Sequence, residues 1–535
     1  MPVQTRVIHY YVCLGAAGGK EWKVFMNTVE SKSAVKNSVL RVMIAAVLII
    51  IQVFLIVNLA IHLSEYYAAF DTIMSLIAFL CVLRIYGRPD NSAFKLSWIV
   101  LILIFPVFGL AIYLLFGRPS LLKTVQKKFN RVNDYLNSYK IETEGYELLQ
   151  KEDPLHATEA YYLQSLGFPT FDHTKMKFYS STNEALEAQL NDLNNAKEFI
   201  FMEYHAIEDS KAWRQIEDIL VERVKQGVDV RVFYDDMGSV GFINNKFRTR
   251  LHEEGIQCRV FNPIFPVLNT FMNNRDHRKI TVIDGLIGYT GGYNLADEYF
   301  NYTHPYGLWK DSGVRLEGDA VDSLTKIFFE MWQTSSKEDN EDLTPYLKGN
   351  KVEGEGYIIP YSDTPLDDEE TGENVYLNMI KHAVHHIYIT TPYLILSDEM
   401  QRELILASKR GVDVRIITPG IPDKAVVFAM TRSYYSNLVK AGIHIYEYTP
   451  GFIHSKQCLV DDQVGVVGTI NFDFRSLYLH FENGCWFTHN HAVKELREDF
   501  DELFEISQDV SEQYKNTSVV LRGWRCILRF FSPLM

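Results

Sequence analysis

Two short segments of the chain place a histidine, a lysine, an aspartate and an asparagine at the same spacing. In each segment the lysine follows the histidine by two residues, the aspartate by seven and the asparagine by seventeen. The first set is His277, Lys279, Asp284 and Asn294, and the second is His454, Lys456, Asp461 and Asn471. Because all three spacings agree, we interpret the two segments as two copies of one chemical site.

The spacing indicates how each set can meet an anion. An apolar Ile-Thr-Val-Ile pattern follows Lys279, which predicts a strand, and residues two apart on a strand project from the same face. His277 and Lys279 therefore share a face. Asp284 stands at an odd offset before a glycine turn, so it points away from the anion, and we assign it and Asp461 an orienting or folding role within the catalytic motif. The two asparagines can donate amide hydrogen bonds to phosphate-type oxygens.

Two facing imidazoles suit a two-step displacement at phosphorus. One attacks to form a phosphohistidine, and the other protonates the leaving alkoxide and then deprotonates the incoming alcohol. The lysines would neutralise the phosphoryl oxygens as charge develops on them. This chemistry requires no metal, and no carboxylate cluster in the sequence resembles a two-metal site. We expect neither a metal nor another cofactor.

The region around these motifs is itself duplicated. Phe199–Tyr204 and Gly227–Phe233 match Ile387–Tyr393 and Gly411–Ile417 in the same order, with a near-constant offset. Each copy alternates strands with amphipathic helices, which is typical of an α/β unit. The unit is too long for a solenoid repeat. We therefore predict two α/β domains, with the junction in the acidic stretch 337–355.

Composition narrows the function further. Acidic residues outnumber basic ones, 67 to 53, and the net charge of -14 argues against a protein that coats nucleic acid. An apolar fraction of 47% with 22% charged residues fits a folded protein. The 6 cysteines contain no CxxC pair, which favours a reducing compartment and no structural zinc.

Three apolar stretches precede the repeats, at Val42–Ile61, Ala68–Ile85 and Ser97–Phe116. The first and third have the length of a bilayer-spanning helix, and buried core helices are the alternative. Lys and Arg before the first stretch and between the second and third place both segments inside the cell. Pro106 and Gly109 interrupt the third stretch, so we predict a re-entrant segment that keeps the catalytic domains cytoplasmic.

The C-terminal tail is basic and amphipathic. Arg522, Arg525 and Arg529 lie at helical spacing, with apolar residues between them. Such a segment either lies in a membrane interface or packs on the domain as a last helix, and the sequence does not decide between these.

The motifs resemble those of the phospholipase D superfamily, and within it bacterial cardiolipin synthases. The similarity rests on Asn274–Gly285, Gly291–Tyr299, Thr391–Tyr393 and Asn471–Ser476, and on the apolar segment that ends at Gly117. It implies N-terminal transmembrane helices and two duplicated phospholipase D-type α/β sandwich domains packed with pseudo-two-fold symmetry. The expected organisation is a cytoplasmic tail (1–37), a membrane anchor (38–117), a linker (118–150) and the two domains (151–345 and 346–535).

The resemblance also implies a function. A multi-pass protein of the bacterial plasma membrane would condense two phosphatidylglycerol molecules into cardiolipin and glycerol through a phosphohistidine. His277 is the expected nucleophile by superfamily tendency, which leaves His454 as acid and base. By the same resemblance Glu298 and Glu482 would hydrogen-bond the histidines and fix their tautomers, or serve only as ion-pair partners. The chain departs from the family at His480, where asparagine is common, and in the turn 361–365.

Other functions use the same residues. Attack by water gives a phospholipase D hydrolase, and another acceptor alcohol gives a phosphatidylserine synthase. A nuclease of the superfamily is disfavoured because the chain is acidic and has no evident basic groove. A catalytically inactive lipid-binding scaffold is opposed by the two intact histidine–lysine pairs. We expect phosphatidylglycerol and membrane lipid as partners and no nucleic acid; protein partners are not determined.

Overall fold

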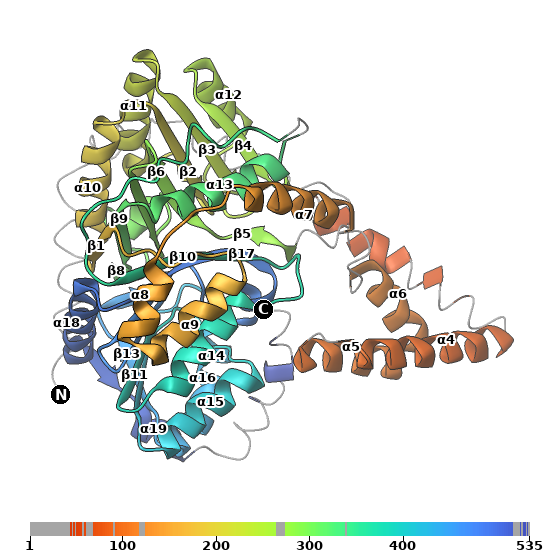
Figure 1. Ribbon diagram of the computed structural model, residues 1–535. Helices are drawn as coiled ribbons and strands as arrows, with labels where there is room; N and C mark the ends of the chain where they lie inside the picture. Colours follow the sequence, from red (N-terminus) through yellow and green to blue (C-terminus); the bar gives the residue numbers. More distant parts are fainter. Residues whose placement is uncertain are drawn as a thin grey trace, which may run out of the picture.

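The chain forms two α/β units, one above the other in Figure 1, and each is built on one large sheet. The computed structural model describes residues 68–88, 91–116, 123–263, 273–336 and 340–516, with separate residues between 43 and 62 and between 525 and 532.

The two sheets have the same strand order. In the first the order is β1-β9-β7-β6-β2-β3-β4, with spans Thr174–Tyr179, Gly313–Gly318, Ile287–Gly291, Lys279–Ile283, Phe199–Tyr204, Asp229–Asp235 and Gln257–Phe261. In the second it is β10-β17-β16-β15-β11-β12-β13-β18, with spans Tyr357–Asp363, His480–Thr488, Val464–Gly468, Gln457–Val460, His386–Thr390, Asp413–Pro419, His444–Tyr448 and Ser507–Asp509. In both, three parallel strands join an antiparallel set, β2 to β6 and β11 to β15. The duplicated α/β architecture predicted from the repeat is confirmed.

The central strands are apolar on both faces because helices cover both sides of each sheet. In β2 the side chains of Phe199 and Phe201 join the core between the two units, while Ile200 and Met202 face the outer helices. In β11, likewise, Tyr388 joins the core between the two units and Ile387 faces the outer helices. The alternation of side chains along a strand thus assigns each residue to an inner or an outer core.

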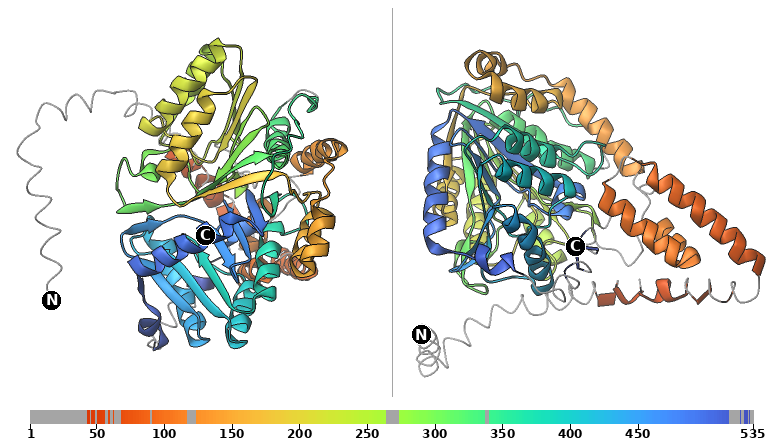
Figure 2. Two further views of the ribbon diagram at one scale, coloured as in Figure 1. Left: turned by 60° about the vertical axis from the view of Figure 1, so that its left-hand side comes forward. Right: turned by 90° about the horizontal axis from the view of Figure 1, so that it is seen from below.

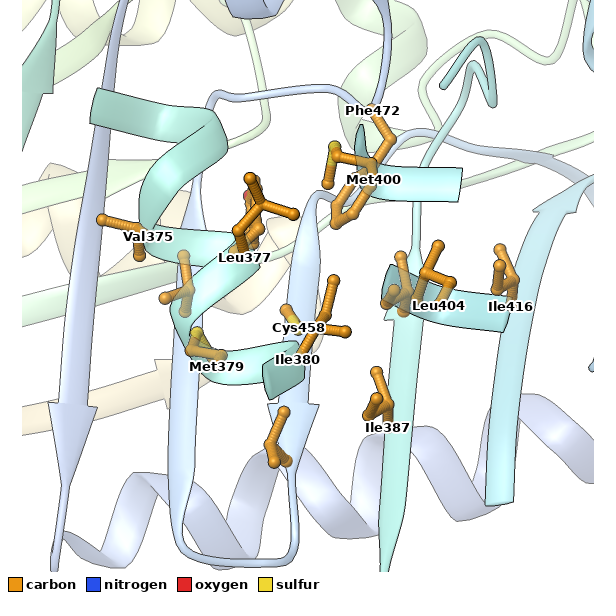
Figure 3. Packing of buried hydrophobic residues seen from close by; sticks show 14 of the residues in the cluster. Val375, Leu377, Met379, Ile380, Ile387, Met400, Leu404, Ile416, Cys458 and Phe472 are labelled. Carbon is orange, nitrogen blue, oxygen red and sulfur yellow. The ribbon is translucent and has the colours of Figure 1, made fainter. Parts of the chain in front are cut away.

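The outer face of each sheet is covered by a layer of three helices. On the first sheet these are α10 (Thr182–Asn194), α11 (Lys211–Lys225) and α12 (Asn245–Glu253), and on the second they are α14 (Thr371–His382), α15 (Asp398–Lys409) and α16 (Ala425–Lys440). Figure 3 shows the second layer, where Ile380 and Leu404 lie over Ile387 and Cys458 of the sheet. These side chains are fully buried, so the layer fixes the strands that carry the site.

One core joins the two units. It contains residues of both sheets and of two long helices, α13 (Val321–Thr334) and α18 (His491–Ile506). Phe328 of α13 stacks on Phe201 with ring centroids 4.9 Å apart, and Phe500 of α18 contacts Tyr388 at 5.7 Å. Because the inner faces share this core, the units hold a fixed relation to each other (Figure 2).

Three helices precede the first sheet and contact both units. Helix α7 (Lys123–Ser138) packs on α13 of the first unit, whereas α8 (Gly145–Glu152) and α9 (Pro154–Ser165) bury Leu149, Ala157 and Leu163 in the outer core of the second. The boundary predicted at residue 151 therefore does not follow the packing. Residues 145–165 cover the second unit although the first sheet follows them in the chain, a non-local contact that a linear repeat pattern does not show.

The N-terminal helices α4 (Ala68–Tyr86), α5 (Ser92–Ile104) and α6 (Pro106–Phe116) stand away from the two sheets, as Figure 2 shows. The third apolar stretch breaks into two helices at Phe105–Pro106. Gly109 lies within α6, where a Cβ would meet the backbone of Leu101 and Ile102. Within the described residues, no helix is long and apolar enough to cross a membrane. The tail 1–37 and much of the stretch 42–61 lie outside the described residues.

The described part of the C-terminal tail contacts the second unit. Arg529 donates to the carbonyl of Ser433 at 2.8 Å and its guanidinium lies over the Tyr434 ring. Arg525 lies over Tyr514. These contacts match the packed-helix alternative at both residues; Arg522 lies outside the described residues.

Candidate active site

Each candidate histidine is held by a strand of the other unit. The short strand β5 (Arg275–Asp276) pairs in parallel with β17, and the next residue, His277, donates its backbone N–H to the carbonyl of Phe481 at 2.8 Å. Likewise β14 (Gly451–Ile453) pairs with β8 (Leu308–Lys310), and His454 donates its backbone N–H to Lys310 at 2.7 Å. The site is therefore assembled by a reciprocal exchange of strands.

The imidazoles are oriented by carboxylates across the same interface. His277 Nδ1 lies 2.8 Å from Glu482 Oε2, and His454 Nδ1 lies 2.7 Å from Asp311 Oδ2. A carboxylate at Nδ1 fixes the proton on that nitrogen and leaves the Nε2 lone pair for chemistry. Glu482 is itself held by hydrogen bonds from Ser476 and Thr469.

The partner of His454 is Asp311, not Glu298, which corrects the expectation from the resemblance. Glu298 lies in the 3₁₀ helix Asp297–Phe300 and makes no side-chain hydrogen bond to His454 within the described residues. Strand pairing explains the difference. Gly291 pairs with Gly313 in the first sheet, and Gly468 pairs with Gly484 in the second. Asp311 lies two residues before Gly313, and Glu482 lies two residues before Gly484, so the two acids occupy equivalent places in the two units.

The sequence contains a pattern that could have indicated the role of Asp311. Asp311-Ser-Gly313 and Glu482-Asn-Gly484 both read as an acid, a small polar residue and a glycine. The two acids lie at different distances from their histidines, because the first copy carries a longer insertion before its strand. A search at constant spacing therefore misses Asp311.

The lysines lie beside the histidines and are fully buried. Lys279 Nζ donates to the carbonyl of His277 at 2.5 Å. Lys456 Nζ donates to the carbonyl of His454 and lies 3.0 Å from His454 Nε2. Each lysine thus lies beside its own histidine, as the predicted shared face requires, and Lys456 reaches the ring nitrogen that would meet a phosphoryl group.

The motif aspartates hold turns, away from the histidines. Asp284 accepts hydrogen bonds from the backbone N–H groups of Lys197, Glu198 and Phe199 at 2.7–2.9 Å. Asp461 does the same for Val384, His385 and His386, each at 2.7 Å. Both aspartates have left-handed backbones, with φ of 54° and 55°. These contacts give the residues a folding function at the entry of β2 and β11.

The motif asparagines differ from each other. Asn294 accepts from the backbone N–H of Ala206 and donates to the hydroxyl of Tyr299 at 2.8 Å, so it organises the wall beside His454. Asn471 is buried, and its Oδ1 has no hydrogen-bond partner among the described residues. The structure therefore gives Asn294 protein partners where the sequence predicts a phosphate contact.

Burial controls the charges of the centre. It lowers the pKa of His277 well below the usual value, with Lys279 adding to the effect, and it lowers the pKa of His454 to about 4. Burial also lowers the pKa of Lys279 to about 8 and that of Lys456 to about 7. Without an anion between them, both imidazoles are neutral at pH 7.

The two carboxylates are not equivalent. Burial raises the pKa of Glu482 well above its ordinary value, although Lys279 opposes this. At Asp311 burial acts in the same direction, but the His454 ring and Lys456 outweigh it and lower the pKa. His454 therefore faces an ionised counter-ion, whereas Glu482 stabilises a cationic His277 less.

The walls around the two histidines also differ. The His277 ring lies between two more imidazoles, His205 at 4.9 Å and His480 at 5.6 Å between centroids. The His454 ring is enclosed by Tyr299, Trp309 and Phe452. One half of the centre is thus polar and the other aromatic.

The described residues contain one group at this centre that could hold a metal ion. The ligand atoms of His277, His480 and Glu482 lie within 4.8 Å of one another. Both oxygens of Glu482 already accept hydrogen bonds from His277 and from a hydroxyl group. The oxygens of Glu482 are therefore already used to orient His277.

Comparison with known proteins decides the family. Residues 190–332 and 376–504 match the model of the cardiolipin synthase phospholipase D-like domain, and residues 73–118 match the phospholipase D-nuclease N-terminal family. Cardiolipin synthase 2 of Bacillus cereus is 36% identical over 463 residues, 85% of this chain and 89% of that protein. The chain belongs to the cardiolipin synthase family.

Two further similarities fit this family. An uncharacterized protein of Streptococcus mutans is 39% identical over 465 residues, 85% of this chain and 99% of that protein. Among solved structures, phosphatidylserine synthase of Haemophilus influenzae Rd KW20 superimposes with a TM-score of 0.54 at 15% identity, over 70% of this chain and 98% of that one. This likeness shows the shared fold of the two-unit body. The residues matched by the family model include His277 and His454, and the strand before each of them pairs with the other unit.

Proposed function

We propose that this chain condenses two phosphatidylglycerol molecules into cardiolipin and glycerol. The observation that carries the proposal is the reciprocal centre, in which each histidine is oriented by a carboxylate of the other unit and flanked by a buried lysine. A centre of this kind suits two successive displacements at one phosphorus atom. Membership of the cardiolipin synthase family and the curated cardiolipin synthases that resemble the chain favour phosphatidylglycerol as donor and acceptor.

In the first step His277 Nε2 attacks the phosphorus of the donor lipid. The bond from phosphorus to the glycerol headgroup breaks, and the leaving alkoxide takes a proton from His454. The products are glycerol and a phosphatidyl group bound to His277. Lys279 and Lys456 stabilise the charge that develops on the phosphoryl oxygens.

In the second step His454 removes the proton from a headgroup hydroxyl of a second phosphatidylglycerol. That oxygen attacks the phosphorus, and the bond from phosphorus to His277 breaks. Cardiolipin leaves, His277 is regenerated, and His454 holds the proton for the next cycle. The atoms and charges balance without a further reactant.

The unequal surroundings support this assignment of the histidines. His454 faces the ionised Asp311, which stabilises the imidazolium that an acid requires, and the phosphodiester anion raises the pKa of His454 when it binds. Burial, with Lys279 and two neighbouring imidazoles adding to the effect, lowers the pKa of His277, so the ring stays neutral, as a nucleophile must.

The experiment is to incubate the full chain in membranes with labelled phosphatidylglycerol and to resolve the products. We expect cardiolipin and glycerol, with loss of both in His277→Ala and in His454→Ala. Phosphatidic acid as the sole product would instead identify a hydrolase, and phosphatidylserine formed from an activated donor and serine would identify the other transferase. No product from active membranes would favour the scaffold.

A second donor tests which histidine is the nucleophile. A phosphatidyl ester of p-nitrophenol has a leaving group that needs no proton. We expect His454→Ala to release p-nitrophenol from it and His277→Ala to release none. The reverse pattern would exchange the two assignments.

We also infer that helices α4–α6 attach the enzyme to the plasma membrane. Helix α4 exposes Ile73, Leu76, Leu80 and Leu83, each more than half accessible, on a segment that packs on α5 and α6 and not on the sheets. An apolar surface of this kind suits lipid. A C-terminal tag that stays protected in intact cells would support the cytoplasmic location of the two units, and labelling from outside would contradict it.

A further inference from the structure

An arginine without a carboxylate partner lies next to the candidate centre. Arg475, in α17 (Phe474–Tyr478), is partly buried, and within the described residues its side chain makes one hydrogen bond, from Nε to Nε2 of His480 at 3.4 Å. It forms no ion pair with any described carboxylate. By contrast, the buried guanidiniums of Arg275 and Arg278 lie 2.7 Å from Asp235 and Glu330. A partly buried guanidinium without a counter-ion is suited to bind an anion.

The charges around Arg475 do not offset the effect of its burial. Burial lowers the pKa of Arg475 and Arg275 adds to this, although Asp473 and Asp235 act in the opposite direction. Arg475 and the imidazoles of His205 and His480 all lie on the polar side of the centre. This side can therefore accept a further negative charge, beyond that of the phosphoryl group between His277 and His454.

His480 sets the orientation of the guanidinium. Burial and Arg475 keep the pKa of His480 well below its usual value, so the ring is neutral and its Nε2 can accept the Nε–H of Arg475. With Nε used in this way, the two terminal nitrogens of Arg475 remain as a pair of parallel donors. Such a pair fits two oxygens of a phosphate group.

The position of Arg475 couples it to the reaction. The next residue, Ser476, donates to Glu482 at 2.7 Å, and Glu482 holds His277. The His480 ring, which carries Arg475, lies 5.6 Å from the ring of His277. Arg475 is thus one side chain away from the reacting phosphorus. In the product, the two phosphates are joined by one glycerol.

We propose that Arg475, held by His480, forms a second phosphate-binding subsite that receives the phosphodiester of the acceptor lipid. The inference rests on the proposed function, because only a phospholipid acceptor brings a second phosphate to the centre. The subsite explains selection of phosphatidylglycerol over water or a simple alcohol, since these lack the anion. The ligand chemistry is a phosphate oxyanion, which free inorganic phosphate shares.

The test is a competition within one reaction. The full chain in phosphatidylglycerol vesicles is supplied with ethanol, and the ratio of cardiolipin to phosphatidylethanol is measured. Both products arise from the same phosphohistidine, so the ratio reports acceptor choice and is independent of the overall rate. In Arg475→Gln we expect this ratio to fall at least about tenfold, the effect of losing one charge-assisted contact. An unchanged ratio would overturn the proposal.

Matched variants separate the subsite from a structural role. Arg475→Lys keeps the charge without the paired donors and should give an intermediate ratio, while Arg402→Gln, on the exposed face of α15, should give the wild-type ratio. His480→Leu removes the acceptor for Arg475 and should lower the ratio. His480→Asn, whose amide oxygen can accept the same Nε–H, should restore it. Equal ratios for His480→Leu and His480→Asn would contradict the positioning role.

Inorganic phosphate tests the wild-type chain without substitution. If the subsite binds a phosphate oxyanion, added phosphate should lower cardiolipin formation more than phosphatidylethanol formation. Equal inhibition of both products would place the phosphate only between the two histidines and would count against the subsite. A wild-type chain that makes phosphatidylethanol or phosphatidic acid but no cardiolipin would refute the proposed function itself, a result distinct from a change of ratio in Arg475→Gln.

Discussion

At the scale of single residues, the two halves of the centre have the same groups in different surroundings. Both histidines and both lysines are buried, but one carboxylate is an aspartate with a lowered pKa and the other a glutamate with a raised pKa. The two histidines therefore face carboxylates with different pKa values. Such unequal environments suit one histidine to act as the nucleophile and the other as the acid.

Asp311 should matter far more than Glu298. Replacement of Asp311 by asparagine keeps the shape but removes the charge and allows the wrong tautomer of His454. We expect kcat to fall on the order of 10³-fold, as in other histidine–carboxylate pairs, with little change in KM. Glu298→Gln is the matched control, because within the described residues Glu298 makes no side-chain hydrogen bond to His454. Equal losses in the two variants would contradict the assignment.

The lysines predict an alkaline limit to activity. Burial lowers the pKa of Lys456 to about 7 and of Lys279 to about 8, and only the cationic forms neutralise a phosphate. Because each lysine loses its proton as the pH rises through its pKa, kcat/KM should decline above about pH 7. A bound phosphate raises the pKa of both lysines, so the decline of kcat should begin at a higher pH than the decline of kcat/KM. Steady-state kinetics across the pH range checks this, and a kcat/KM that stays flat into the alkaline range would contradict it.

At the scale of elements, two very short strands do most of the positioning. β5 and β14 each end one residue before a histidine, and each is paired with a strand of the other unit. Neither has a strong strand pattern of its own, because two or three residues carry too little periodicity. Their conformation depends on the partner strand.

Gly451→Ala should therefore inactivate the enzyme without unfolding it. A Cβ at Gly451 would meet the backbone nitrogen and oxygen of Leu308, so β14 would have to move away from β8. His454 lies three residues further on, and a displacement of about 1 Å costs roughly 10² in rate. Gly87→Ala, where the nearest atom would lie at 3.6 Å, is the control. Full activity in Gly451→Ala, with circular dichroism unchanged, would contradict this role of the strand pair.

At the scale of the whole molecule, the shared inner core makes the two units one structure. Helices α13 and α18 lie in that core, and α8 and α9 connect the linker to the second unit. The active site lies at the same interface, so its geometry depends on this packing.

The shared core predicts that a destabilising substitution in one unit also destabilises the other unit. Asp461→Ala removes the acceptor for three backbone N–H groups at the entry of β11 and should destabilise the protein by about 2 kcal/mol. Because the core is continuous, hydrogen exchange should rise in β2 of the first unit as well as in β11. Mass spectrometry of exchanged peptides measures both, with Asp284→Ala as the reciprocal variant. Faster exchange confined to the mutated unit would show that the units unfold separately.

The sequence by itself determined the α/β class, the duplication and the two histidine–lysine pairs, because strand alternation and repeat spacing are local signals. It also indicated that Asp284 and Asp461 point away from the anion, since an odd offset on a strand reverses the side chain. The family resemblance predicted Glu482 as a partner of a histidine, because the second copy follows the family spacing.

Only the tertiary structure decided how the two copies meet. Asp311 was missed because an insertion shifts it along the chain, whereas strand register, which depends on hydrogen bonding between distant segments, gives it the place in the first unit that Glu482 has in the second. The exchange of β5 and β14 and the packing of residues 145–165 on the second unit are contacts between segments far apart in the chain. Spacing along one chain does not encode such contacts, because they form only when the inner faces of both sheets are buried together.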